Sequence, residues 1–123
     1  MKKLLLLFVI ILMGSACNKV SDEEMEKATV NKIDCYTMKE KMVEGAVLID
    51  VRTKAEYDAG TLEFAINVPV ETIESNILDK VSSKDTPIIV FCRSGNRSSE
   101  AANKLIELGY TKVYDLGAMN SCN

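Results

Sequence analysis

The sequence predicts an α/β fold, with one domain built on a central, mostly parallel sheet of about five strands and helices on both faces. Its 123 residues, 47% of them hydrophobic and 27% charged, have the length and composition of a single globular domain. Two short apolar runs, 46–49 and 87–91, are typical of strands buried on both faces. Helical patterns separate the strand-like runs, and such alternation implies parallel strands joined by crossover helices.

The first two helices carry their own start signals. Asp34 can cap a helix over 35–44, and Gly45 can end it. Thr53 and Glu56 form a capping box, in which each residue satisfies a backbone N–H of the other. The box predicts a short helix directly after Thr53.

The remaining elements follow from apolar spacing and from the positions of glycine and proline. A helix over 72–81 would place its apolar residues Ile73, Ile77, Leu78 and Val81 on one side. In chain order, the expected elements are a helix at 35–44, a strand at 46–49, a short helix ending at Gly60, a strand at 65–68, a helix at 72–81, a strand at 87–91, a helix at 98–108 and a strand at 112–116.

A positively charged and then apolar segment opens the chain. Lys2 and Lys3 precede the apolar run 4–13, whose ten residues are too few to span a bilayer. The run ends in Gly14-Ser15-Ala16-Cys17, which resembles the cleavage and lipidation site of bacterial lipoproteins. The alternative is an ordinary secretory signal in which Cys17 has no role.

The lipoprotein resemblance implies a division of the chain and a location. The parts are a signal peptide at 1–16, a lipidated Cys17 with a polar tether at 17–28, and a folded domain at 29–123. Such a protein is exported and held by its N-terminal lipid on the extracytoplasmic face of a bacterial membrane.

Composition removes several classes of function. The chain has no histidine, which excludes Ser-His-Asp triads, Cys-His pairs and His-ligated metals. The four cysteines, Cys17, Cys35, Cys92 and Cys122, are too far apart for a zinc knuckle or a Cys-x-x-Cys motif. The formal net charge is −3 and no basic run follows Lys3, which argues against nucleic acid as a partner. We expect no metal, no organic cofactor and, for one small domain, a monomer.

Cys92 is the candidate nucleophile. It directly follows the strand at 87–91, and active sites of open α/β sheets lie beyond the carboxyl ends of strands. Gly95 allows the following turn to point backbone N–H groups inward, and the helix at 98–108 adds the positive end of its dipole. These groups favour a thiolate without any imidazole. The alternative is a structural cysteine buried at the end of a strand.

Segments in order and at natural spacing resemble the rhodanese-like family over roughly residues 30–119. They are Leu48–Arg52, Glu56-Tyr57, Gly60, Ala65–Pro69, Val90–Ser98, Gly109-Tyr110, Val113-Tyr114 and Leu116-Gly117. Two positions differ from the family pattern: Thr61 stands where histidine is frequent, and Ala118 where a second glycine is frequent.

The resemblance implies sulfurtransferase activity. A small anionic donor such as thiosulfate would load a persulfide onto Cys92, and a thiophilic acceptor (cyanide, a thiol or a protein) would remove the sulfur. The residues expected to bind the anion and surround the persulfide are Arg93, Ser94, Gly95, Asn96, Arg97 and Ser98. Asp50 and Arg52 also match the family and are expected to support the site structurally, with Glu56 as a partner of Arg52.

Two other functions remain open. Cysteine-dependent phosphatases use a Cys-x5-Arg loop, whereas Cys92 and Arg97 form the shorter Cys-x4-Arg. An extracytoplasmic thiol-redox or persulfide-sensing and binding module would use Cys92 with Cys122, or with Cys35, as a resolving partner. Cys122 could equally be a bystander near the C-terminus, and Cys35 a packing residue.

Overall fold

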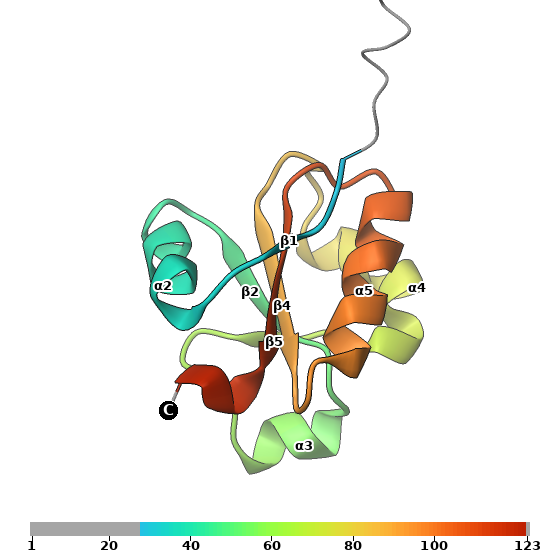
Figure 1. The fold of residues 1–123 in the computed structure, drawn as a ribbon. Helices are drawn as coiled ribbons and strands as arrows, with labels where there is room; N and C mark the ends of the chain where they lie inside the picture. The colour runs from blue at the N-terminus through green and yellow to red at the C-terminus, as the bar shows by residue number, and fades with distance from the viewer. Residues whose placement is uncertain (1–27, 123) are drawn as a thin grey trace, which may run out of the picture.

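The computed structural model describes residues 28–122, which form a five-stranded parallel sheet in the order β1-β5-β4-β2-β3 (Figure 1). The strands are β1 (Asn31–Lys32), β2 (Val47–Asp50), β3 (Ile66–Asn67), β4 (Ile88–Cys92) and β5 (Val113–Ala118). The helices are α2 (Cys35–Val43), α3 (Lys54–Ala59), α4 (Ile73–Lys80) and α5 (Asn96–Glu107), with 3-10 turns η1 (Val70–Thr72) and η2 (Met119–Cys122). Helix α2 covers one face of the sheet and α4 and α5 cover the other, which confirms the predicted fold class.

The start signals of the first two helices are confirmed. Asp34 Oδ1 accepts a hydrogen bond of 2.9 Å from the Thr37 N–H at the start of α2. At α3, Thr53 Oγ1 accepts from the Glu56 N–H at 3.2 Å, and Glu56 Oε1 accepts from the Thr53 N–H at 3.1 Å. The box therefore fixes both the start of α3 and the orientation of the Glu56 side chain.

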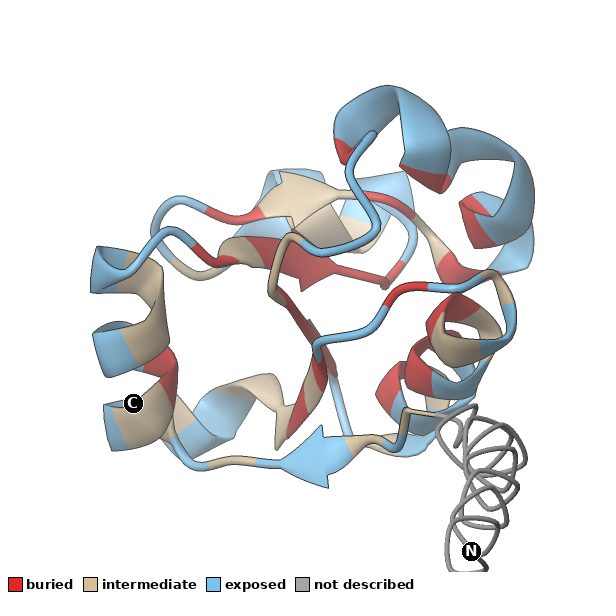
Figure 2. Cartoon of the chain, turned by 90° about the horizontal axis from the view of Figure 1, so that it is seen from above, coloured by how far each residue is buried: buried red, intermediate tan, exposed pale blue. Residues whose placement is uncertain are grey.

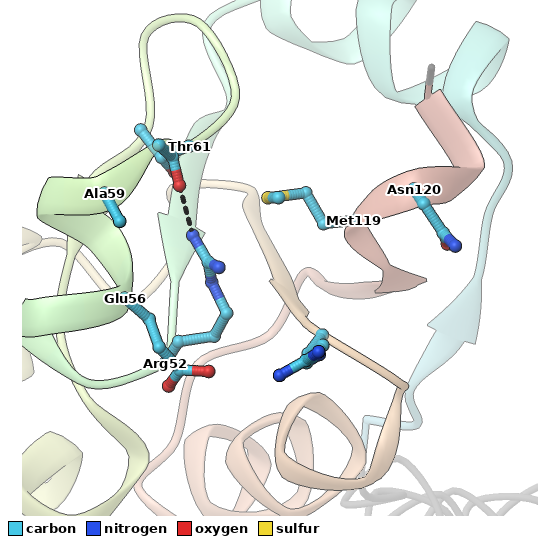
Figure 3. A pocket seen from close by; sticks show the side chains of 8 residues that line it. Arg52, Glu56, Ala59, Thr61, Met119 and Asn120 are labelled. Carbon is cyan, nitrogen blue, oxygen red and sulfur yellow. Dashed lines mark hydrogen bonds between the residues drawn. The ribbon is translucent and has the colours of Figure 1, made fainter.

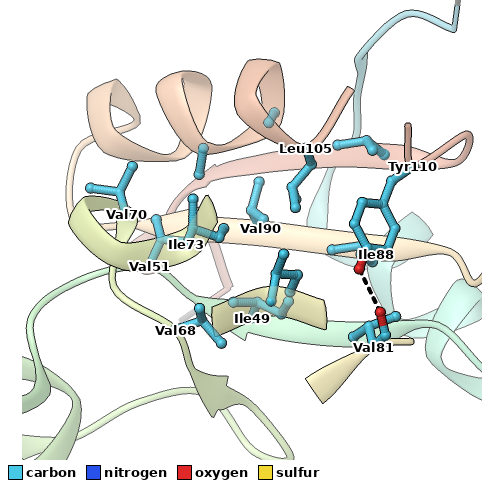
Figure 4. Packing of buried hydrophobic residues seen from close by; sticks show 14 of the residues in the cluster. Ile49, Val51, Val68, Val70, Ile73, Val81, Ile88, Val90, Leu105 and Tyr110 are labelled. Carbon is cyan, nitrogen blue, oxygen red and sulfur yellow. Dashed lines mark hydrogen bonds between the residues drawn. The ribbon is translucent and has the colours of Figure 1, made fainter. Parts of the chain in front are cut away.

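Strand β4 lies at the centre of the sheet, and all of its residues are buried (Figure 2). Because side chains of a strand alternate between faces, Ile88, Val90 and Cys92 join the cluster beneath α4 and α5, shown in Figure 4. Ile89 and Phe91 join a smaller cluster beneath α2. The side chain of the candidate nucleophile therefore belongs to the α5 face of the sheet.

Element boundaries differ from the expected ones near both ends of the domain. Strand β1 was not expected, because its two exposed residues carry no periodicity and become a strand only by pairing with Tyr114 and Asp115 of β5. Strand β5 continues to Ala118, two residues past the expected end. Helix α5 begins at Asn96 rather than residue 98, since the left-handed conformation of Gly95 (φ 105°) completes the turn sooner.

The expected apolar side of the helix after η1 is narrower than its sequence suggests. Ile73 and Ile77 are buried, and Val81, which directly follows α4, is buried too. Leu78, expected on the same side, is 53% exposed. The helix has only eight residues, so a single i, i+4 pair contacts the sheet and its neighbour points to solvent.

A disulfide joins Cys35, in the first turn of α2, to Cys122, in η2. The disulfide contradicts the alternative in which Cys122 or Cys35 is a resolving partner of Cys92, and Cys122 is not a bystander. Cys35 is a packing residue, as expected, and is bonded to Cys122 as well. Cys35 and Cys122 can bond to each other because both pack against the cluster beneath α2. Cys92 lies in the cluster beneath α5, on the other face of the sheet. Among the described residues, Cys92 is the one free cysteine, and it is buried.

The expected signal peptide, Cys17 and most of the tether lie outside the described residues. Within 28–122, no helix combines the length and the apolar character needed to cross a membrane.

Candidate active site

Cys92 is the last residue of β4, and backbone donors surround its sulfur. Its Sγ accepts hydrogen bonds from the N–H of Gly95 at 3.0 Å and from the N–H of Ser98 at 3.3 Å. Ser98 lies in the first turn of α5, whose positive dipole end therefore meets the sulfur. Cys92 is fully buried, so these N–H groups replace water as donors to a thiolate.

The loop that presents these donors depends on a glycine and a serine. Gly95 has φ 105°, a left-handed conformation that side chains other than glycine rarely adopt. Ser98 is buried, and its hydroxyl donates to the Gly95 carbonyl oxygen at 3.1 Å. Ser98 therefore has two roles at the site: its N–H donates to the sulfur, and its hydroxyl stabilises the turn that positions the Gly95 N–H.

Arg97 pairs with Glu56 across the loop. Its Nη1 donates to Glu56 Oε1 at 2.8 Å, and its Nη2 donates to Oε2 at 3.1 Å, a two-point contact between α5 and α3. The hydrogen bonds from Arg97, and next the one from the Thr53 backbone, lower the pKa of Glu56 from 4.5 to about 2. The expected pairing of Glu56 with Arg52 is wrong, because Arg52 is already bound to Asp50.

The two arginines of the loop therefore have different surroundings. The charge of Arg97 is balanced by Glu56, and this pairing raises the pKa of the guanidinium. Arg93 directly follows Cys92, is exposed, and has no ion-pair partner among residues 28–122. Arg93 is thus the cation available to an incoming anion, while Arg97 positions the loop.

Asp50 and Arg52 form a buried ion pair at the end of β2. Arg52 Nη2 donates to Asp50 Oδ2 at 2.7 Å, and its Nε donates to Oδ1 at 2.9 Å. Arg52 Nη2 also donates to the Gly60 carbonyl at 2.6 Å, and the Thr61 hydroxyl donates to Asp50 Oδ2 at 2.8 Å. The hydrogen bond to Asp50 raises the pKa of Arg52. The pair thereby fixes the loop after α3 against the end of β2.

A pocket of about 520 Å³ opens beside these groups (Figure 3). Its lining residues are Arg52, Glu56, Ala59, Gly60, Thr61, Arg93, Met119 and Asn120. A pocket of this size accommodates a small anion together with the reactive end of a larger molecule. Cys92 is not among the lining residues and is fully buried, but its chain neighbour Arg93 lines the pocket.

The structure brings the expected loop, 93–98, around Cys92, and it places Arg52 in the neighbouring pocket. Ser94 and Asn96 are exposed, and Cys17 lies outside the described residues. Six pocket residues were missed as site residues: Glu56, Ala59, Gly60, Thr61, Met119 and Asn120. The capping box of Glu56 was a local signal, because it fixes the side chain that Arg97 meets.

The fold and the site define a class of protein: a small α/β domain with a cysteine anion-binding loop at the end of a central strand. Between residues 28 and 122, no three His, Cys, Asp or Glu side chains are grouped in a way that could hold a metal ion. The chemistry that this class supports is nucleophilic attack by a thiolate, with an anion as substrate or product.

Comparison with known proteins identifies the family. A family model described as a rhodanese-like domain matches residues 35–120. A sulfurtransferase of Allochromatium vinosum is 33% identical over 89 residues, which are 71% of this chain and 81% of that protein. The thiosulfate sulfurtransferase PspE of Escherichia coli is 34% identical over 71 residues, 58% of this chain and 68% of that protein.

Solved structures agree with the family match. A rhodanese with anions from E. coli has a TM-score of 0.60 at 32% identity, covering 62% of this chain and 89% of that chain. The human single-domain sulfurtransferase TSTD1 has a TM-score of 0.64 at 26% identity, covering 73% of this chain and 92% of that chain. This chain therefore belongs to the rhodanese-like family, and it is an enzyme of the sulfurtransferase class.

Removing one member of the buried ion pair will destabilise the fold. We expect Asp50→Ala to lower the free energy of unfolding by about 3 kcal/mol, because it leaves the guanidinium of Arg52 buried and unpaired. The measurement is urea unfolding followed by circular dichroism. Asp58→Ala is the matched control, since Asp58 forms an exposed pair with Lys54 and should change stability little. Equal losses in the two variants would contradict the structural role of the Asp50 pair.

The Glu56–Arg97 pair makes stability depend on pH. Folding lowers the pKa of Glu56 from 4.5 to about 2, so its ionised form is favoured in the folded chain. The stabilisation is therefore complete above about pH 4.5 and is lost as the pH falls towards 2. We expect Glu56→Gln to be less stable than wild type at pH 6, and the difference to vanish near pH 2.

Urea unfolding at a series of pH values measures this difference. Glu74→Gln is the matched control, because it removes an exposed helix carboxylate that has no ion pair among residues 28–122. If the free energy of unfolding of the wild type exceeds that of Glu56→Gln by the same amount from pH 6 to pH 2, Arg97 does not stabilise the carboxylate.

Proposed function

We propose that this chain carries sulfane sulfur as a persulfide on Cys92, from a thiosulfate-like anion to a thiophilic acceptor. The observation that carries the proposal is the pair of backbone N–H groups, from Gly95 and Ser98, that donate to a fully buried Cys92 Sγ. Such donors stabilise a thiolate, and they can stabilise the terminal sulfur of a persulfide in the same way. Relatives named sulfurtransferase and thiosulfate sulfurtransferase support the choice of donor class.

The proposed reaction has two displacement steps. The Cys92 thiolate attacks the outer sulfur of thiosulfate, so that a new S–S bond forms while the bond to the sulfonate sulfur breaks. Sulfite leaves with the electron pair of the broken bond, and the enzyme retains a persulfide anion. A nucleophile such as cyanide then attacks the outer sulfur, leaves as thiocyanate and returns the thiolate. No net oxidation or reduction is required.

The surrounding residues have distinct proposed roles in these steps. Arg93, which lines the pocket and has no ion-pair partner among residues 28–122, attracts the doubly charged donor. Arg52 also lines the pocket, but its charge is balanced by Asp50. Arg97 is held by Glu56 and keeps the first turn of α5 against the sulfur. No general acid is needed, because the leaving sulfite requires no proton.

The persulfide can be tested by mass spectrometry of the intact protein. Thiosulfate should add the mass of one sulfur atom to the wild type, and cyanide should remove it. Cys92→Ser should gain nothing, whereas Ser99→Ala, an exposed change in the same helix turn, should load as the wild type does. Failure of reduced wild type to gain sulfur would overturn the proposal in favour of a binding or sensing module.

We also propose that the protein is exported and anchored by a lipid on Cys17, with its domain on the extracytoplasmic face of a membrane. The leader residues Lys2 and Lys3, the apolar run 4–13 and the small residues before Cys17 support this proposal. The Cys35–Cys122 disulfide supports it independently, since disulfides persist in oxidising compartments outside the cytoplasm.

Expression with a labelled fatty acid tests the anchor. In a bacterial host, the full chain should incorporate label and sediment with membranes, and Cys17→Ser should do neither. Cys35→Ser is the control, because it removes a different cysteine and should keep the label. Labelling that persists in Cys17→Ser would contradict the anchor.

A further inference from the structure

The end of β5 brings the C-terminal turn next to the nucleophile. In the parallel register of β4 and β5, Cys92 is paired with Ala118, the last residue of β5. Turn η2 starts at the next residue, Met119. Met119 therefore follows directly on the residue that pairs with Cys92, although it is more than twenty positions from the loop in sequence.

Two residues of this turn line the pocket. Met119 and Asn120 form the side opposite Arg52 and Thr61, and Figure 3 shows the Met119 side chain extending from η2 towards those two residues. The remaining lining residues come from the loop after β2, from α3 and the loop that follows it, and from the Cys92 loop. The pocket thus has a charged side, with Arg52, Glu56 and Arg93, and a neutral side with the thioether of Met119 and the amide of Asn120.

The disulfide joins the neutral side of the pocket to α2. Cys122, three residues after Met119, is bonded to Cys35 at the start of α2, with their Cα atoms 5.3 Å apart. Ser121 donates only to the Ala118 carbonyl, a contact within the same segment. Among the described residues, the other attachment of η2 is apolar packing of Met119 and Cys122 beneath α2.

We propose that Met119 determines which acceptors reach the Cys92 persulfide, and that the Cys35–Cys122 disulfide holds it in that position; this inference rests on the proposed function. A small dianionic donor responds mainly to Arg93, because that guanidinium has no ion-pair partner among residues 28–122 and charge governs the binding of the donor. A bulky acceptor fills more of the pocket, and it therefore meets the Met119 side chain that lines the pocket. Met119 therefore acts on the second step and disfavours large thiols relative to cyanide.

The test compares two acceptors on protein that has already been loaded. Persulfidated protein is mixed with cyanide or with glutathione, and kcat/KM for sulfur release is measured for each. We expect Met119→Ala and the double variant Cys35→Ser/Cys122→Ser to raise the glutathione-to-cyanide ratio by about tenfold, the discrimination that a few methylenes provide. Loading by thiosulfate is measured in parallel, so that an effect on the first step is separated from an effect on the choice of acceptor.

Met42→Ala is the matched control, because Met42 packs in the same apolar cluster but lines a different groove, between α2 and residues 62–64. The glutathione-to-cyanide ratio of kcat/KM for Met42→Ala should equal that of the wild type. Intact mass before and after mixing checks that glutathione has not reduced the disulfide. If the double variant does not fold, Met119→Ala still decides the role of the side chain.

Each remaining outcome is decisive. An unchanged ratio in Met119→Ala overturns the inference while leaving the persulfide cycle intact. A raised ratio in Met119→Ala with no change in a folded double variant overturns the positioning role of the disulfide. Absence of sulfur loading in the wild type overturns the proposed function and this inference together.

Discussion

A buried sulfur anion is stable only where hydrogen-bond donors replace the water that it has lost, and the N–H groups of Gly95 and Ser98 do so for Cys92. Both donors exist because the chain turns sharply after β4, and the turn needs the left-handed conformation of Gly95. The hydroxyl of Ser98 then binds the Gly95 carbonyl and closes the turn on itself. The strand, the turn and the start of α5 therefore form one unit around a single atom.

One ion pair connects this unit to α3, and a second ion pair fixes the neighbouring loops. The two pairs differ in burial and therefore in what their loss would change. The Asp50–Arg52 pair is buried and fixes the loops after β2 and α3, so its loss affects the whole fold. The Glu56–Arg97 pair is partly exposed and joins α3 to α5, so its loss affects mainly the position of the loop. Because Glu56 balances Arg97, the positive charge offered to a substrate comes from Arg93.

Sequence reasoning succeeded where a signal is local. The capping box at Thr53, the apolar run of β4 and the glycine turn after Cys92 each occupy a few consecutive residues, so their structures could be predicted. It failed where two distant segments must meet. The partner of Glu56 depends on how α3 packs beside α5, and the disulfide depends on which side of the sheet η2 turns towards. Strand β1 exists only because β5 lies beside it.

The disulfide also bears on the chemistry open to Cys92. A thiol-redox role requires a second cysteine that can reach the oxidised sulfur and resolve it. Cys35 and Cys122 are bonded to each other on the opposite side of the sheet, and Cys92 is enclosed by its own loop. Within the described residues, Cys92 therefore has no intramolecular thiol with which to exchange. A sulfur carried on Cys92 must leave through the pocket to an external acceptor, which favours group transfer over disulfide exchange.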